Sequence, residues 1–413
     1  MEAFKLTQVL RNFGTNQLKK LTTMKILNVD DELDMEMLIS QRFRKQIRDK
    51  QFEFVFAHNG IEALEKLDEH EDIALILSDI NMPEMDGLTF LSMVNERKNP
   101  ALKAVMVSAY GDMDNIRVAM NRGAYDFITK PINFEDLEIT INKTIEHINM
   151  VKLFQHERDQ LVAIKNDLDI AKEIQQSMLP KESPPFPDRL DIDLHAFLEP
   201  AKVVGGDLFD YFLLDENHLF FIIGDVSDKG IPAALFMAIT KAIFKSHFLS
   251  PTYQNLTDEV RQVNHFLSTN NNSFMFVTAF MGIINLKTGS VEYIDAGHEP
   301  PLIRRKDGTV ETVKKQGGLA LAIDKDYAYT PQSLQLAHGD TFFLYTDGAT
   351  DANNRENDRY GFKRLEEHLH ALSGEETPKE INDSLLAKLK EFIGEEDQFD
   401  DITVLTIHYK EDM

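Results

Sequence analysis

Between Lys25 and Pro131 the sequence alternates short apolar runs with amphipathic stretches, and this alternation constrains the fold of the segment more than any other feature. The apolar runs are rich in Ile, Leu, Val and Phe, and helical patterns lie between them. Such a rhythm is typical of parallel strands that are joined by helices. We therefore predict a parallel sheet wrapped by helices, with strands at KILNV, FEFVF, IALILS, AVMVS and YDFIT.

Polar residues stand at the ends of four of these apolar runs. Asp30 and Asp31 follow the first run, Asp79 follows the third, Ser108 ends the fourth and Lys130 follows the fifth. Because parallel sheets gather their strand ends along one edge, we expect these groups to meet in one crevice. Clustered carboxylates repel one another unless a cation lies among them, and oxygen ligands select a hard ion such as Mg²⁺. An alternative stays open, in which Asp31 caps the following helix and Asp79 opens a turn.

Four segments of this region, VDDE, LSDINMPEMDG, VSAYG and GAYDFITKP, occur in an order that resembles the receiver domain of two-component response regulators. The resemblance covers roughly residues 24–145. It implies a flavodoxin-like fold, with a five-stranded parallel sheet and helices on both faces. It also implies that Asp79 accepts a phosphoryl group from a sensor histidine kinase. The added charge would draw Ser108 and Lys130 toward it and repack that face of the domain.

The same resemblance implies one Mg²⁺ ion beside the phosphoacceptor. Receiver domains are inputs, so the output of the protein has to be sought further along the chain. The implied ion ligands are Asp30, Asp31, Asp79 and the backbone carbonyl of Asn81, the phosphoryl contacts are Ser108 and Lys130, and the aromatic switch is Phe127.

After Pro131 a helical pattern without glycine continues as far as Gly205. Its apolar residues recur at spacings of three and four with gaps, and such a stripe can pair with its own copy. We predict a helical coiled-coil linker over residues 146–184 that makes the protein a homodimer; the alternative is one amphipathic helix packed on a neighbouring domain. The run SPPFP, residues 183–187, forces extended backbone and closes the linker. The stripe consists of Met150, Phe154, Leu161, Ile164, Leu168, Ala171 and Met178.

Residues 219–239, LFFIIGDVSDKGIPAALFMAI, contain an apolar run that ends at Asp225, followed by a glycine-containing turn and a second apolar run. A strand, a tight turn and a helix in this order usually place the carboxylate at the mouth of a site. The turn is not a P-loop, because Lys229 precedes its glycine and Ile231 stands where Ser or Thr is required. Comparable settings occur at Asp207 in VVGGDLFD, at Asp347 in YTDGAT, and at Asp400 with Asp401 before ITVLTI.

Four carboxylate positions at strand ends would repel one another by about several kcal/mol unless divalent cations offset them. Two hard ions that share one bridging carboxylate would satisfy this requirement. Such a pair lowers the pKa of a bound water toward neutral and orients phosphoryl oxygens, so the pattern indicates hydrolytic chemistry.

Strand-like runs continue beyond the linker, together with two longer helical patterns, and predict sheets and helices in separate layers. Six ordered segments, EPAKVVGGDLFDYF, GDVSDKGIPAALFMA, DAGHEPPLI, LYTDGATDANN, YGFKRL and FDDITVLTI, occur here, and AKEIQQSMLP precedes them in the linker. They resemble the catalytic domain of metal-dependent (PPM-type) serine/threonine phosphatases, in the bacterial SpoIIE-type branch, over about residues 185–410. The resemblance implies a layered α-β-β-α sandwich.

The resemblance also implies two Mn²⁺ or Mg²⁺ ions and a role for each acidic motif. Asp225, Asp347 and Asp400 would be the catalytic residues. Asp225 would bridge the two ions, the carbonyl of Val226 would complete one site, and Asp347 with Asp400 would hold the second ion. Asp207 would reach the first ion directly or through water. No covalent intermediate is needed, in keeping with the absence of cysteine.

Several residues depart from the family pattern or have two interpretations. Asp228 stands where relatives usually have glycine, and aspartate can occupy a left-handed turn at some strain. Asp351 replaces a glutamate, and Ala322 replaces a frequent glycine. Two lysines, Lys202 and Lys229, would either attract the substrate phosphate or be solvated surface residues, and His298 would either donate a proton, bind metal or fix a turn beside two prolines.

The composition excludes several classes of partner. A net charge of −25 over 413 residues opposes nucleic-acid binding, including a DNA-binding output, which requires clustered Lys and Arg. The absence of cysteine excludes disulfides and thiolate metal sites, and no stretch approaches the roughly 20 apolar residues of a membrane span. The first residues lack the apolar core of a signal peptide, so we expect a cytoplasmic protein.

We predict four segments along the chain: an N-terminal extension at 1–23, a receiver domain at 24–145, the linker at 146–184 and the phosphatase domain at 185–413. The resemblance implies dephosphorylation of phosphoserine or phosphothreonine on a protein, an anti-sigma-factor antagonist, under the control of Asp79. A hypothesis from a different class is a catalytically silent phosphatase-like adaptor that binds or sequesters a partner protein.

Overall fold

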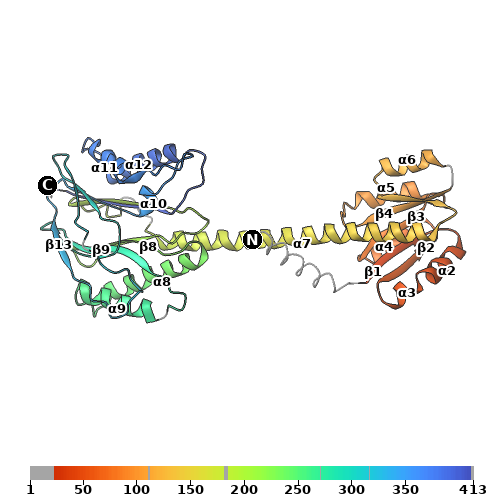
Figure 1. Ribbon diagram of the computed structural model, residues 1–413, viewed down its shortest axis with the longest axis horizontal. Coiled ribbons are helices and arrows are strands. Elements are labelled where there is room, and N and C mark those ends of the chain that lie inside the picture. Colours follow the sequence, from red (N-terminus) through yellow and green to blue (C-terminus); the bar gives the residue numbers. More distant parts are fainter. Residues whose placement is uncertain (1–22, 110–111, 181–184, 270, 316, 411–413) are drawn as a thin grey trace. The chain divides into compact units, whose positions relative to one another are not determined.

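The computed structural model of the protein shows two compact units, Met1–Ala163 and Ile164–Met413 (Figure 1). No helix in the described part of the chain combines the length and apolar character needed to cross a bilayer. The N-terminal extension predicted at 1–23 lies almost wholly outside the described residues. The structure describes residues 23–109, 112–180, 185–269, 271–315 and 317–410.

The first unit contains a five-stranded parallel sheet with the strand order β2-β1-β3-β4-β5. The central strand β3 is buried along its whole length, as its unbroken apolar run requires. Each of the five predicted apolar runs forms a strand, and the prediction of a flavodoxin-like sheet is confirmed. The strands are β1 (Met24–Val29), β2 (Phe52–Ala57), β3 (Ile73–Asp79), β4 (Lys103–Ala109) and β5 (Asp126–Lys130).

Helices cover both faces of this sheet (Figure 1). One core lies between the sheet and α2, α3 and the start of α7, and the other lies under α4, α5 and α6. Local signals fix the helix starts, because the side chains of Asn59 and Asp86 accept hydrogen bonds from the first backbone N–H groups of α4 and α5. The helices are α2 (Leu33–Arg42), α3 (Arg44–Arg48), α4 (Gly60–Glu69), α5 (Gly87–Glu96) and α6 (Met113–Asn121).

Helix α7 runs without a break from Phe134 to Met178. It therefore contains both the last receiver helix and most of the linker predicted at 146–184. Its first turns pack on the receiver sheet, where Ile148 is fully buried. Beyond that point the predicted stripe leaves the sheet, and Met150 and Leu161 are 56% and 67% exposed. An exposed apolar stripe of this length is what a coiled coil would cover, and dimerisation through α7 stays a prediction.

The second unit is built on two five-stranded antiparallel sheets, with the orders β13-β10-β9-β8-β7 and β12-β11-β14-β15-β6. A core of aromatic and aliphatic side chains lies between the two sheets. The strands of the first sheet are β7 (Leu208–Leu213), β8 (His218–Val226), β9 (Val277–Asn285), β10 (Ser290–Ala296) and β13 (Gln332–Gln335). Those of the second are β6 (Ile192–Glu199), β11 (Leu302–Arg304), β12 (Val310–Thr312), β14 (Thr341–Tyr345) and β15 (Ile402–Tyr409).

Helices form the two outer layers of this sandwich (Figure 1). A further hydrophobic core lies between each sheet and the helices that cover it. The prediction of a layered α-β-β-α sandwich is confirmed. The prediction of two longer helical patterns was wrong, because each sheet carries a pair of helices. A sheet of five strands is roughly 19 Å wide, which is about twice the diameter of one helix, so one helix cannot cover it. The helices are α8 (Ile231–Phe248), α9 (Leu256–Thr269), α11 (Gly361–His370) and α12 (Pro378–Ile393), with a single turn at α10 (Asp347–Thr350).

Candidate functional sites

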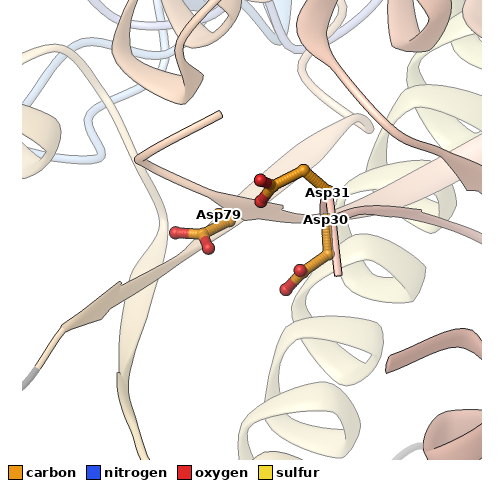
Figure 2. A group of neighbouring side chains, drawn as sticks. All are labelled: Asp30, Asp31 and Asp79. Carbon is orange, nitrogen blue, oxygen red and sulfur yellow. The ribbon is translucent and has the colours of Figure 1, made fainter. Parts of the chain in front are cut away.

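The first candidate site lies at the carboxyl ends of β1, β3 and β5. Asp30 and Asp79 are buried there and Asp31 is exposed (Figure 2). The ammonium of Lys130 lies 2.6 Å from Asp79 Oδ2, 3.1 Å from Asp30 Oδ2 and 2.9 Å from Glu32 Oε1. The parallel topology thus brings together the acidic residues and the lysine that the sequence placed at separate strand ends.

The oxygen ligands of this site are compact enough for one ion. Asp30, Asp31 and Asp79 each offer one oxygen, and these three oxygens lie within 4.8 Å of one another. In the described part of the chain, no other three His, Cys, Asp or Glu side chains offer ligand atoms this close together. Burial raises the pKa of Asp30, although a hydrogen bond from the Glu32 N–H and the charge of Lys130 oppose the shift. Burial alone would lower the pKa of Lys130, but its hydrogen bonds to Asp79 and Glu32 outweigh this and raise it. An oxygen-only cluster of this size fits Mg²⁺.

The remaining predicted receiver residues surround this cluster. Ser108 is fully buried on β4, and its hydroxyl has no hydrogen-bond partner in the described part of the chain. A buried hydroxyl without a partner is costly, and a phosphoryl oxygen on Asp79 would offer one. Asn81 donates its N–H to Asp79 Oδ1 at 3.2 Å. Phe127 lies on β5 and is 37% exposed.

The second candidate site is a group of five aspartates at the ends of strands from both antiparallel sheets, which we name the carboxylate cluster. Burial and mutual repulsion raise the pKa of four of its members, so the structure brings their charges together. The cluster consists of Asp207 just before β7, Asp225 near the end of β8, Asp347 at the start of α10, and Asp400 and Asp401 just before β15.

Two threonines fix the most deeply buried member of the cluster. Asp207 is 1% exposed, and its Oδ2 accepts hydrogen bonds from Thr346 Oγ1 at 2.8 Å and Thr403 Oγ1 at 2.6 Å. Burial raises the pKa of Asp207 well above its usual value; the charges of Asp225 and Asp401 add to the shift and the two hydroxyls oppose it. Sequence reasoning missed both threonines, because their only signal is a position next to an aspartate motif.

Asp225 is repelled by three other members of the carboxylate cluster. Burial raises its pKa to about 7; the charges of Asp347, Asp400 and Asp401 add to this, and a hydrogen bond with Asp207 opposes it. Near neutral pH the cluster therefore holds carboxylates that lack enough positive charge to balance them. All of the donors are oxygens, which is the ligand set that Mn²⁺ and Mg²⁺ prefer. The donor atoms therefore suit divalent metal, although the described residues bring three ligand oxygens within 4.8 Å of one another only at the receiver site and not here.

The end of α7 is hydrogen-bonded to the loop that leads into β7. The buried side chain of Gln175 donates from Nε2 to Gly205 O at 2.7 Å and accepts from Gly205 N at 3.1 Å. The next residue, Gly206, donates its N–H to Asp401 Oδ2 at 2.6 Å, and Ala201 donates to Asp401 Oδ1 at 2.7 Å. A Cβ at Gly205 would lie 2.5 Å from Asp401 Oδ2, so this contact requires glycine. Gln175 was not predicted to have a role, and Asp401 was named only together with Asp400 as a candidate carboxylate.

His298 is a structural residue. It is 3% exposed; its Nδ1 lies 3.2 Å from Thr278 Oγ1 and its Nε2 lies 3.1 Å from Tyr345 O. Burial lowers its pKa to about 4. A carbonyl only accepts, so Nε2 carries the proton and Nδ1 accepts from the threonine. Because both nitrogens are engaged, His298 bridges β9 and β14 and supports the strand that leads to Asp347.

The departures from the family pattern have local explanations. Asp228 and Ala322 have φ angles of 68° and 69°, the left-handed region in which glycine is favoured. Asp351 accepts a hydrogen bond from Arg359 Nη1 at 2.9 Å. Of the two candidate lysines, Lys202 is exposed, whereas Lys229 lies 2.8 Å from Asp400 Oδ2 and is therefore part of the site.

The layered sandwich with acidic residues at its strand ends defines the class of protein, and comparisons with known proteins agree. Residues 26–142 match the response regulator receiver domain family, and residues 215–410 match stage II sporulation protein E (SpoIIE). Among solved structures, the SiaA-PP2C domain of Pseudomonas aeruginosa superposes with a TM-score of 0.53 at 23% identity, over 61% of this chain and 99% of that one. This likeness shows the PPM-type fold.

Three known proteins are similar to parts of this chain. Phosphoserine phosphatase RsbU of Bacillus subtilis is 32% identical over 60% of this chain and 71% of its own length. Protein IcfG of Synechocystis is 30% identical over 74% of this chain. The match covers 50% of the length of IcfG. Chemotaxis protein CheY of Listeria monocytogenes is 41% identical over 26% of this chain and 87% of its own length. The chain belongs to the SpoIIE-type family of metal-dependent PPM phosphatases and carries a response regulator receiver domain.

Proposed function

We propose that the protein is a response regulator whose output is metal-dependent hydrolysis of phosphoserine or phosphothreonine on a protein. The observation that carries the proposal is the carboxylate cluster, in which four of five aspartates have raised pKa values because burial and the charges of the other aspartates disfavour their ionised forms. Retention of every predicted acidic ligand position is expected of a catalyst and is not needed by a silent adaptor.

In this proposal two Mn²⁺ or Mg²⁺ ions would be held by Asp225, shared between both, by Asp347 and Asp400 for the second, and by Asp207 and the carbonyl of Val226 for the first. The bound ions supply a nucleophilic hydroxide at neutral pH and neutralise charge on the phosphoryl oxygens. The chain positions these ligands on rigid strand ends, and the threonine hydroxyls on Asp207 fix its orientation. No side chain has to form a covalent intermediate.

Hydrolysis of p-nitrophenyl phosphate tests this proposal directly. We expect wild-type protein to hydrolyse it in the presence of Mn²⁺ and to stop when the metal is chelated. Asp347→Asn removes one ligand of the second ion with little change of shape, so the rate should fall at least about a hundredfold. Asp358→Asn, at an exposed position, controls for the loss of one surface charge. No hydrolysis by wild-type protein in Mn²⁺ would reject the proposal in favour of the adaptor, and hydrolysis that the chelator does not change would reject its dependence on metal.

The natural substrate follows from the family relationship and not from the site. We infer a phosphorylated anti-sigma-factor antagonist from the resemblance to the SpoIIE-type family, and the relative RsbU is named a phosphoserine phosphatase. The kinase partner would be a sensor histidine kinase that phosphorylates Asp79. One Mg²⁺ would bind at Asp30, Asp31, Asp79 and the carbonyl of Asn81, with Ser108, Lys130 and Phe127 responding to the phosphoryl group.

We infer further that α7 transmits the state of Asp79 to the carboxylate cluster. The helix begins in the receiver and ends at Met178, three residues after Gln175, whose amide holds Gly205, and the adjacent Gly206 is bound to Asp401. A movement of the end of α7 would therefore shift the loop before β7 and its hydrogen bond to Asp401. The phosphoryl group can drive this change only by the free energy with which it prefers one arrangement of α7.

Beryllofluoride, which mimics the acyl phosphate, tests the coupling. We expect it to change the wild-type rate by at least about fivefold, and to leave the rates of Asp79→Ala and Gln175→Ala unchanged. Gln176→Ala is the matched control, because its side chain is exposed while that of Gln175 is buried. Gln175→Ala must still bind beryllofluoride, measured on the receiver. Identical rates for wild type and Asp79→Ala at every mimic concentration would discard the coupling.

A further inference from the structure

The side chain of Lys229 makes three contacts with the segment that enters β15. Its ammonium lies 2.8 Å from Asp400 Oδ2 and donates to Phe399 O at 2.7 Å. The same ammonium lies over the Phe399 ring, 4.4 Å from the ring centroid. The side chains of Lys229 and Asp400 are 35% and 23% exposed, so the pair is partly withdrawn from water. Such a charge-assisted contact is stronger than an ordinary surface ion pair.

The backbone of the loop between β8 and α8 directs this lysine into the site. Asp228 and Gly230, on either side of it, have φ angles of 68° and 84°. Ser227 anchors the base of the loop, because its N–H donates to Phe276 O and its Oγ accepts from Phe276 N, both at 2.9 Å. The loop is therefore held in a conformation that places Lys229 against Asp400.

Both carboxylate oxygens of Asp400 are already engaged. Oδ1 accepts the N–H of Asp401 at 3.0 Å, and Oδ2 faces the ammonium of Lys229. Among the residues that the structure describes, Lys229 is the one lysine or arginine that forms an ion pair with the carboxylate cluster. Each carboxylate oxygen can accept from more than one partner, but a divalent cation bound to Asp400 would lie close to the ammonium of Lys229 and repel it. The ammonium stands on a flexible side chain and can move away, whereas the Asp401 N–H is fixed in the backbone.

We propose that Lys229 competes with the divalent ion for Asp400. With metal absent, the ammonium neutralises the carboxylate; metal binding breaks this ion pair and releases Lys229. The lysine thereby weakens metal binding at the second position and sets the concentration at which the site fills. Lys229 precedes the first residue of α8, Ile231, by only two positions, so a shift of α8 would also change this competition. The inference rests on the proposed metal-dependent function.

Direct measurement of Mn²⁺ binding to the full chain by titration calorimetry tests the competition. We expect Lys229→Met to bind the weaker Mn²⁺ ion about tenfold more tightly than wild type, since a hydrogen bond to a charged group no longer has to be broken. Lys229→Arg keeps the ion pair and should stay near wild type. Lys202→Met removes an exposed positive charge from a nearby loop and controls for charge loss alone. Equal affinities for Lys229→Met and Lys202→Met would overturn the proposal.

Lysine acylation gives a second readout that needs no activity. An ammonium that is held against a carboxylate is shielded from an acylating reagent, so labelling of Lys229, followed by mass spectrometry, should rise when Mn²⁺ is added. Labelling of Lys202 should not change. Unchanged or decreased labelling of Lys229 in Mn²⁺-saturated protein would contradict the release. If wild type binds no Mn²⁺ at all, the proposed function fails together with this inference; Mn²⁺ binding that ignores Lys229 overturns the inference alone.

Discussion

Replacing Asp225 with asparagine is expected to abolish metal-dependent hydrolysis and, in the same protein, to stabilise the metal-free phosphatase domain. The loss of activity should be about a thousandfold or more, because Asp225 is the proposed bridge between both ions and its loss removes charge stabilisation worth at least several kcal/mol. The gain in stability follows from the removal of a charge that burial and three neighbouring aspartates disfavour.

The stabilisation should depend on pH in a defined direction. The pKa of Asp225 rises from 3.8 to about 7 on folding, so between these values the folded chain binds more protons than the unfolded chain. Raising the pH through this window therefore lowers the free energy of unfolding of the metal-free wild type. An asparagine side chain cannot ionise, so the Asp225→Asn variant avoids this loss. The advantage of the variant should therefore grow between pH 5 and pH 8, and at pH 8 the variant should melt about 2–4 °C higher.

Thermal melts in EDTA at both pH values, repeated with excess Mn²⁺, measure these effects. Added Mn²⁺ should reverse the order, because it stabilises wild type by mass action and stabilises the variant less. Asp358→Asn, which removes an exposed carboxylate elsewhere in the domain, should change neither the melts nor their response to Mn²⁺. A variant that is less stable than wild type at pH 8 without metal would contradict the origin assigned to the raised pKa.

Most of the receiver could be predicted from the sequence because its information is local. Five apolar runs form five strands, and parallel topology alone placed Asp30, Asp79 and Lys130 at the same edge of the sheet. The rule that strand ends of a parallel sheet converge needs no knowledge of side-chain packing. Local patterns could not predict that α7 is one continuous helix. One continuous helix and two packed helices have the same apolar periodicity.

The carboxylate cluster was predictable only in part. Its proposed ligands stand at the ends of strands and carry a visible signal, whereas Thr346, Thr403 and Gln175 act through contacts that join distant segments. A threonine that donates to a carboxylate looks the same in sequence as one that packs in a strand. Lys229 had two interpretations for the same reason, and the ion pair with Asp400 decides between them.

The phosphatase domain contains a buried ion pair that the sequence did not reveal. Lys241 of α8 and Asp210 of β7 are each 3% exposed at the side chain and lie 2.5 Å apart, and the ammonium also donates to Phe209 O at 2.9 Å. Burial lowers the pKa of Lys241, which shows how little water reaches it. The pair ties the helix that follows Asp225 to the strand that follows Asp207.

Lys241→Met is therefore expected to lower the free energy of unfolding of the phosphatase domain by about 3–5 kcal/mol, because it leaves the carboxylate of Asp210 buried without a partner. Urea denaturation of the full chain, followed by a signal from the second unit, measures the loss. Lys245→Met is the matched control: it lies one turn further along the same helix, is exposed, and should cost less than about 1 kcal/mol.

The double variant Lys241→Met/Asp210→Leu separates a missing charge partner from a missing packing contact. Replacing both ions by apolar side chains of similar size leaves no unpaired charge, so most of the lost stability should return. Methionine and leucine do not fix the position of α8 relative to β7 as an ion pair does. We therefore expect the double variant to regain stability but not Mn²⁺-dependent activity. A loss for Lys241→Met as small as that for Lys245→Met would show that the pair does not hold these two elements together.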